Sequence, residues 1–143
     1  MVTDLQRLVA IEEIKKLKAR YFRLLDEHDW VAFAELFTED AHLDIAESSS
    51  GAHTLGEFLA ALEKHLTPAV SVHHGHMPEI DVVDERTATG VWAMFDSVEP
   101  PAGSPYPVLT GFGHYHEEYR FDDGSWRISG LRLTRLKRET RAA

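Results

Sequence analysis

The sequence lacks several features on which whole classes of protein depend. It contains no cysteine, which excludes a disulfide framework, a thiolate nucleophile and a zinc site held by thiolates. No apolar run approaches the ~18 residues that a membrane-spanning helix needs. The first residues have neither the basic start nor the apolar run of a signal peptide. These absences predict a cytoplasmic protein.

Positive charge is also in short supply. Lys and Arg total 15 against 24 Asp and Glu residues, so the formal net charge is -9 at pH 7. Nucleic acids and anionic membranes are bound by basic surfaces, so we expect neither as a partner. The 143 residues, 43% of them hydrophobic, are enough to bury one core. We therefore expect a single domain over residues 1–143.

The sequence also lacks the motifs that are typical of cofactor binding or of a catalytic nucleophile. There is no His-Glu-x-x-His, no Gly-x-Gly-x-x-Gly and no phosphate-binding loop. Gly111-x-Gly113 has the wrong context for such a loop and indicates a bend or close packing in a strand. His74 and His76 could chelate a metal together with His114 or His116, but we expect neither a metal nor a cofactor.

The first third of the chain predicts two helices. Apolar residues recur at steps of three and four from Leu8 to Leu24, which is the stripe of an amphipathic helix spanning about Asp4 to His28. Asp29 resembles the N-cap of a second helix that runs through Phe37 and ends at the acidic pair 39–40.

The rest of the chain predicts strands around a third helix. A short strand at 41–46 and a loop at 48–51 precede Thr54 and Glu57, whose spacing fits a capping box. The helix that follows ends at Pro68. Strands are expected at 70–83, 87–97, 107–121 and 125–138. Helices followed by strands predict an α+β fold, with a curved antiparallel sheet wrapped around the long first helix. Such a cone has an open end and an apolar cavity on its concave side.

Titratable residues gather on two of these strands. The first carries His73, His74 and His76, and the second carries His114 and His116. Buried titratable groups are costly and often functional, so the pattern predicts proton-transfer chemistry in an apolar cavity. Alternation sends His73 to one face and His74 to the other, and either can be the one that lines the cavity.

The second strand leaves the same choice open. His114 and His116 share a face with Phe112, whereas Tyr115 and Tyr119 point the other way. If His114 points inward, it can act as the general acid for a leaving hydroxyl. If the tyrosines point inward, the histidines lie on the surface or in a dimer contact.

Four segments give the chain its resemblance to a known family. They are Ile11 to Asp44, His73-His-Gly-His76, Glu85 to Trp92, and Tyr115 to Leu133 with its Asp-Gly-Ser-Trp turn. Together they resemble the SnoaL-like group of the nuclear-transport-factor-2-like (NTF2-like) superfamily. The resemblance implies a cystatin-like α+β barrel and a homodimer. Because this fold hosts many reactions, it does not specify one.

The dehydratase and dehydrochlorinase branches of that group pair an aspartate at the end of the first helix with a strand histidine. Asp26 matches the aspartate, and His73 matches the first position of a His-x-x-x-Asn motif, although Met77 replaces the asparagine. By the same resemblance, His114 matches a second histidine and Arg132 a basic residue of the last strand.

The resemblance also matches Tyr21 to a tyrosine that activates a water or a carbonyl. Because Tyr21 lies five residues before Asp26, the two are about 140° apart on a helix, and a core tyrosine is the alternative. Trp92, Met94 and Phe112 are candidates for binding the substrate, with plain core packing as their alternative.

The expected chemistry is general-base catalysis. A carboxylate that holds one imidazole nitrogen fixes its tautomer, and the other nitrogen can then remove a proton from carbon. We expect a dehydratase-like lyase or isomerase acting on a small apolar carbonyl compound. The alternative is a non-catalytic ligand-binding or dimeric interaction module, in which Asp26 merely caps the helix.

Overall fold

The computed structural model describes residues 1–45 and 52–143. The order of the elements in these residues is α1 (Asp4–Glu27), α2 (Trp30–Ala34), β1 (Phe37–Ile45), β2 (Ala52–Thr54), α3 (Leu55–Leu66), β3 (Val70–Val82), β4 (Thr87–Glu99), β5 (Val108–Asp122) and β6 (Ser125–Arg141). The predicted loop at 48–51 and Ala46, the last residue of the predicted first strand, lie outside the described residues.

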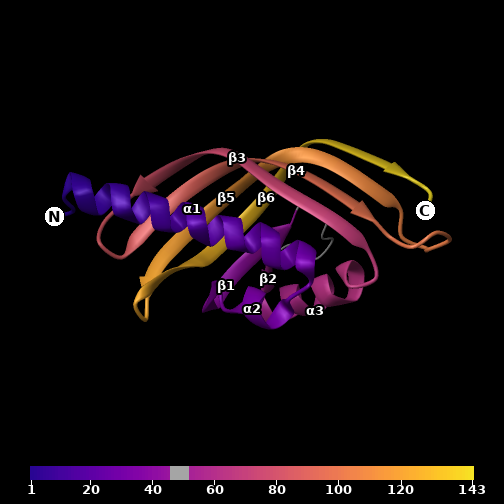
Figure 1. Cartoon of the computed structure of the whole chain (residues 1–143), viewed down its shortest axis with the longest axis horizontal. Coiled ribbons are helices and arrows are strands. Elements are labelled where there is room, and N and C mark those ends of the chain that lie inside the picture. The colour runs from indigo at the N-terminus through magenta and orange to yellow at the C-terminus, as the bar shows by residue number, and fades with distance from the viewer. Residues whose placement is uncertain (46–51) are drawn as a thin grey trace.

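The strands form one curved sheet in the order β2-β1-β6-β5-β4-β3. Helix α1 crosses its concave face and packs against β3 and β6, while α3 packs against β1 and β2 (Figure 1). This confirms the predicted α+β fold with a long first helix against a curved sheet. The sheet is mixed, not antiparallel as expected, because β1 enters it beside β6 in parallel orientation.

Helix α1 follows its sequence closely. Thr3 and Gln6 form a capping box at its start, and the apolar stripe from Ile14 to Leu25 is buried. The first turns project past the sheet (Figure 1), and Leu5 and Leu8 are exposed there. None of the described helices is both long and apolar enough to cross a membrane.

The prediction of the second helix is wrong for its second half. Helix α2 ends at Ala34, and Phe37 already pairs with Ile128 in the sheet. The backbone N–H of Ile128 donates to the carbonyl of Leu36 at 2.8 Å. Asp40 forms an ion pair with Arg120 at 2.6 Å and does not end a helix. Pairing with a strand from the far end of the chain therefore overrides the local pattern.

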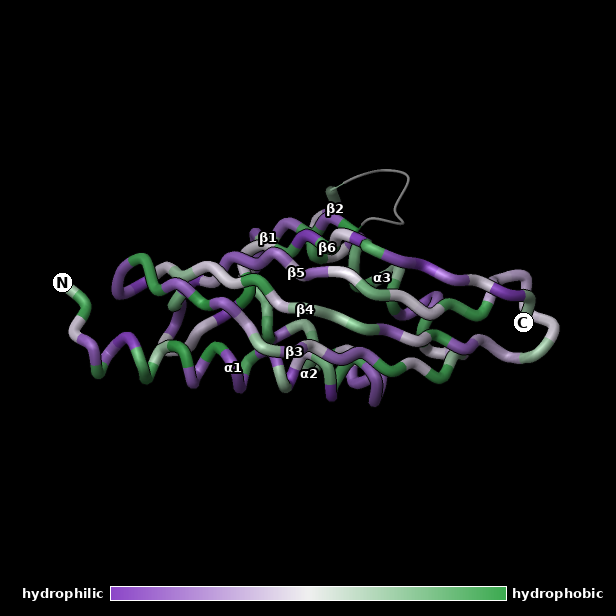
Figure 2. The backbone as a smooth tube through the Cα atoms, turned by 90° about the horizontal axis from the view of Figure 1, so that it is seen from above, coloured by the Kyte–Doolittle hydropathy of each residue, from purple (hydrophilic) through white to green (hydrophobic). Residues whose placement is uncertain are grey.

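Alternation divides the central strands into a buried and an exposed face. Tyr115 and Tyr119 are buried against α1, and so is His73. His74 and His76 are exposed on the other side of the sheet, which we call the convex face. Polar and apolar residues are accordingly interspersed along the strands (Figure 2). The alternation of β3 is interrupted only after His76, where a bulge gives Met77 a φ of 39°.

Candidate active site

A cavity of about 570 Å³ lies between the concave face of the sheet, the second half of α1 and α3. Its size is within the range of small-molecule sites. Most of its wall is apolar and includes Leu25, Phe58, Leu62, Leu66, Val98, Leu109 and Leu133. The cavity expected on the concave side is therefore present.

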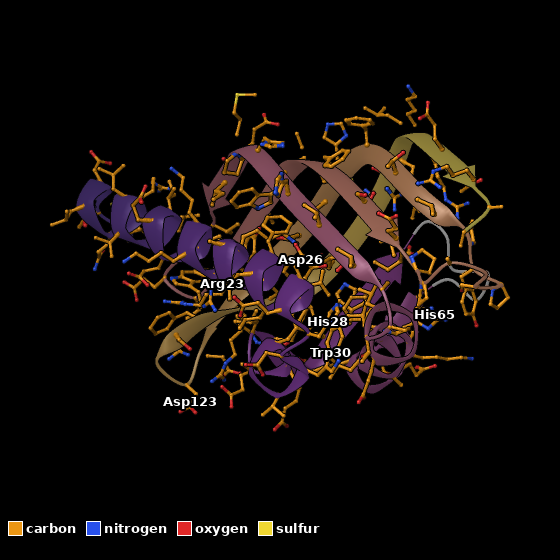
Figure 3. All side chains as sticks on the ribbon, turned by 45° about the vertical axis from the view of Figure 1, so that its right-hand side comes forward. Arg23, Asp26, His28, Trp30, His65 and Asp123 are labelled. Carbon is orange, nitrogen blue, oxygen red and sulfur yellow. The ribbon has the colours of Figure 1, made fainter. Side chains whose placement is uncertain are left out.

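His73 and Asp26 meet at the wall of this cavity. Nδ1 of His73 lies 2.7 Å from Oδ1 of Asp26. Because an ionised carboxylate only accepts hydrogen bonds, Nδ1 carries the proton. The backbone N–H of His73 donates to Oδ2 at 2.8 Å, and the hydroxyl of Ser71 donates to Oδ1 at 3.1 Å. Figure 3 shows Asp26 between the end of α1 and β3. The imidazole is thus fixed with Nε2 as its bare nitrogen.

Asp26 is placed where a helix tolerates a carboxylate poorly. The last turn of a helix carries a partial negative charge, and the last turn of α1 contains no basic residue. Asp26 does not cap this end, because the C-cap is His28, whose backbone N–H bonds the carbonyls of Leu24 and Leu25. The hydrogen bonds from Ser71 and His73 on β3 offset the unfavourable position. The Asp26 side chain therefore orients His73 and does not cap the helix.

Two tyrosine hydroxyls also face the cavity. Tyr21 comes from α1 and Tyr115 from β5, and their hydroxyls are hydrogen-bonded to each other. Burial raises the pKa of both phenols above the ordinary value, and the charge of Glu117 adds to the rise at Tyr21. Both hydroxyls therefore stay protonated near neutral pH and can donate. Tyr21 lines the cavity directly, whereas Asp26, on another side of the helix, acts on it through His73.

A buried ion pair lies behind these tyrosines. Nζ of Lys18 is 2.5 Å from Oε2 of Glu117, and both side chains are fully buried. The same ammonium lies 3.5 Å and 3.7 Å from the ring centroids of Tyr21 and Tyr115. Burial lowers the pKa of Lys18 to about 8, while the neighbouring carboxylate opposes that change. The hydroxyl of Tyr119 donates to Oε1 of Glu117 at 2.6 Å.

A second ion pair lies beside His73. Asp96 is the cross-strand neighbour of His73, and both line the cavity. Arg135 from β6 binds both oxygens of Asp96, at 2.6 Å and 2.8 Å. A Cβ at Gly111 would collide with Arg135 Nη1 and Asp96 Oδ1. The close packing predicted for Gly111 and Gly113 is confirmed, since a Cβ at Gly113 would collide with the carbonyl of Thr134.

Further polar side chains line the cavity. The rings of His65 and Tyr106 are 4.7 Å apart at their centroids. His65 lies on α3, well away from Asp26 (Figure 3). His53 and Arg138 are also lining residues. The cavity thus presents polar and basic side chains besides His73.

Two of the expected catalytic histidines do not reach the cavity. His74 is exposed on the convex face. His114 pairs with Ala93 and Thr134 on that face, because its neighbour Tyr115 takes the inward position. The expectation that either lines the cavity is therefore wrong, and for β5 the tyrosine-inward alternative holds.

The residues expected to bind substrate are not in the cavity wall either. Phe112 is 47% exposed on the convex face, and Arg132 lies there as well. Trp92 is buried in the core, where its Nε1 donates to the hydroxyl of Tyr119 at 2.9 Å. Met94 is buried beside Arg135, with 4.0 Å between sulfur and Nη1. The prediction is wrong for Phe112 and Arg132 because strand alternation turns both to the convex face. It is wrong for Trp92 and Met94 because both pack in the core.

Asp96 and Arg135 are two residues of the site that were not predicted from the sequence. A signal for Asp96 was present, because it shares strand parity with Trp92 and Met94, which marks it as a carboxylate on a buried face. Arg135 carried the same kind of signal, because it shares parity with the buried Leu131 and Leu133, and the bulge in β6 follows it. Within residues 1–45 and 52–143, no group of three His, Cys, Asp or Glu side chains is arranged to hold a metal ion.

Comparisons with solved structures agree with this architecture. A candidate scytalone dehydratase from Novosphingobium aromaticivorans superimposes with a TM-score of 0.86 and 22% identity, over 99% of this chain and 93% of that chain. A type 2 hexachlorocyclohexane dehydrochlorinase gives 0.83 and 19%, over 99% and 95%. An NTF2-like protein with a cystatin-like fold, also from N. aromaticivorans, gives 0.71 and 21%, over 93% and 86%.

These identities establish likeness of fold and leave the reaction open. The sequence itself gives the stronger assignment, because residues 6–132 match the SnoaL-like domain. That match covers most of the chain, including α1, β3 and the hairpin turn between β5 and β6. The chain therefore belongs to the family of SnoaL-like domains.

Proposed function

We propose that the chain is a cofactor-independent lyase or isomerase in which His73 is the general base. The substrate is a small, largely apolar carbonyl compound. The observation that carries the proposal is the 2.7 Å contact between His73 and Asp26 at the wall of an apolar cavity. Such a contact holds Nε2 as a bare nitrogen that can accept a proton.

The reaction begins at the carbon next to the carbonyl. Nε2 of His73 takes the proton from that carbon, and the electron pair moves onto the carbonyl oxygen. Asp26 stabilises the imidazolium that forms, and the hydroxyl of Tyr21 can donate to a substrate oxygen. Loss of a leaving group from the next carbon then gives an unsaturated product. Return of the proton to a different carbon gives an isomer instead.

The position of His114 changes one role in this scheme. With His114 on the convex face, protonation of a departing hydroxyl passes to Tyr21 or to the His73 imidazolium, both of which reach the cavity. The names of two structural neighbours, a dehydratase and a dehydrochlorinase, support a reaction of this kind, because removal of a proton is common to both.

Hydrogen–deuterium exchange tests the proposal without knowledge of the natural substrate. A panel of cyclic and aryl ketones is incubated with the protein in deuterated buffer, and loss of the α-proton signal is followed by NMR. We expect the wild type to accelerate exchange for a subset of the panel. Asp26→Asn should slow that exchange about 100-fold or more, the lower range for a general base.

The histidine next in sequence provides a matched control. His73→Gln should abolish the acceleration, whereas His74→Gln changes the same residue type on the convex face and should leave it unchanged. Equal loss in both variants, or no loss in Asp26→Asn, would rule out this base. A wild type that binds ketones without exchange would favour the alternative, a ligand-binding module.

We also propose that a second copy covers the convex face. The middle of this face carries imidazoles, among them His76, His114 and His116, together with apolar groups. One register row runs from Glu79 on β3 through His116 to Arg132 on β6. A two-fold axis parallel to the central strands would set Glu79 of each copy against Arg132 of the other. Opposite charges at these two positions therefore support a homodimer.

A further inference from the structure

We propose that Arg135, held in place by Asp96, binds the substrate oxygen on which negative charge develops. The substrate class that follows is a compound that forms an oxyanion, such as an enolisable ketone or a phenol. This inference rests on the proposed function, because it assigns the group that faces the oxygen while His73 takes the proton.

Charged groups follow one another along the cavity wall. Asp26 lies behind His73, and Asp96 is the cross-strand neighbour of His73. Arg135 lies beyond Asp96, and its guanidinium reaches over Gly111 to bind both oxygens of Asp96. Deprotonation of the substrate would add one positive charge at His73 and one negative charge on oxygen. The carboxylates of Asp26 and Asp96 lie next to the positive charge that forms on His73. The guanidinium of Arg135 can meet the negative charge that forms on the oxygen.

Burial makes this pair effective. The side chains of Arg135 and Asp96 are 12% and 5% exposed, and both line the cavity. A guanidinium stays charged at every relevant pH, and its planar fork is fixed when both oxygens of a carboxylate are bound. Charges act strongly where water is excluded. The pair is therefore a preorganised site and not a surface ion pair.

Other groups around the cavity could also meet an anion. Tyr21 and Tyr115 are protonated donors in its wall, and His53, His65, Tyr106 and Arg138 line it as well. Arg135 differs from these groups because Asp96, the cross-strand neighbour of the base His73, holds it in a fixed orientation. Asp96 is accordingly a positioning residue, and Arg135 is the residue that touches the oxygen.

Binding of 4-nitrophenol provides the test, because its phenolate and phenol forms differ in absorbance. The bound ratio of the two forms is measured as pH is varied. The wild type should bind the phenolate at least about tenfold more tightly than the phenol, one unit of apparent pKa. The double variant Asp96→Asn/Arg135→Gln keeps the side-chain volumes and can keep a hydrogen bond, so it should fold while losing that preference.

Two further variants complete the design. Arg127→Gln removes the same charge near the start of β6, where Arg127 pairs with Arg120, and should leave the preference intact. Gly111→Ala should reduce the preference independently, because its Cβ displaces the guanidinium. Preference retained in the double variant, equal loss in Arg127→Gln, or no phenolate preference in the wild type would each overturn the proposal. His73→Gln separates the two claims, since it should stop deuterium exchange while phenolate is still preferred.

Discussion

Two buried ion pairs determine the electrostatics around the cavity. Lys18 and Glu117 lie behind the tyrosines, and Asp96 and Arg135 lie beside His73. Removing water from charged groups is costly, and a partner of opposite charge offsets that cost. Loss of one member of such a pair is therefore worse for stability than loss of both.

The Lys18–Glu117 pair gives a direct prediction at the residue scale. Lys18→Met should lower the free energy of unfolding by about 3–5 kcal/mol, because Glu117 is left as an unpaired buried charge. Lys18→Met/Glu117→Gln should recover most of this loss, since Gln can still accept from Tyr119. Urea denaturation followed by circular dichroism measures both. Equal stability of the single and double variants would contradict the account.

Alkaline pH should have two opposite effects on stability. The pKa of Lys18 is lowered from 10.5 to about 8 by burial. Between these values the unfolded chain binds more protons than the folded one, so the free energy of unfolding rises with pH. Unlike Met at this position, the neutral amine of Lys18 can still donate its hydrogen bond to Glu117. The pKa values of Tyr21, Tyr115 and Tyr119 are raised above 10.0 by burial. Their contribution is complete below pH 10 and is lost as the pH rises further.

The expected result is a stability maximum near pH 10, measured by urea denaturation at a series of pH values. In Lys18→Met/Glu117→Gln the rise above pH 8 should be absent, while the fall above pH 10 should remain. A rise of the same size in that variant would show that another group is responsible.

At the scale of elements, local signals were reliable where they involve neighbours in sequence. The capping boxes at Thr3 and Thr54 are formed by residues three apart, and both helices begin where these boxes lie. The boundary between α2 and β1 depends on pairing of Phe37 with Ile128. That contact joins residues far apart in the chain, so the local pattern of apolar residues was misread as helix.

The glycines of β5 and α3 give a prediction at this scale. Gly113→Ala should destabilise the protein by at least about 1–3 kcal/mol, because the added Cβ meets the backbone of Thr134. Gly56→Ala is the matched control, since nothing lies within 4 Å of its Cβ in helix α3. It should stabilise the protein by about 0.5 kcal/mol. Thermal unfolding of both variants measures these effects, and a Gly113→Ala variant as stable as the wild type would contradict the register of β5 against β6.

At the scale of the whole molecule, the convex face decides the state of assembly. Sedimentation velocity should show a dimer for the wild type. Phe112→Asp places a charge on the convex face and should give a monomer. Leu8→Asp makes the same kind of change at an exposed site on α1 and should leave the dimer intact. A wild type of any other mass, or dissociation in both variants, would contradict the proposed interface.

The whole fold also explains how far the site could be predicted. Helix periodicity and family resemblance pointed to Asp26, His73 and Tyr21. The structure places His73 and Tyr21 in the wall of one cavity, with Asp26 bonded to His73. Strand alternation left open which face of β5 is buried, and the answer depended on Glu117, which shares parity with Tyr115. A buried carboxylate there is acceptable only because Lys18 meets it, and the two are 99 positions apart. Sequence alone could not show that pairing.

The most direct measurement of the central claim is the tautomer of His73. Long-range nitrogen–proton NMR of the labelled protein distinguishes an imidazole protonated at Nδ1 from one protonated at Nε2. The account predicts that neutral His73 carries its proton on Nδ1, toward Asp26, with Nε2 bare, and that Asp26→Asn disturbs this preference. A wild-type His73 protonated at Nε2, or one that Asp26→Asn leaves unchanged, would contradict the account.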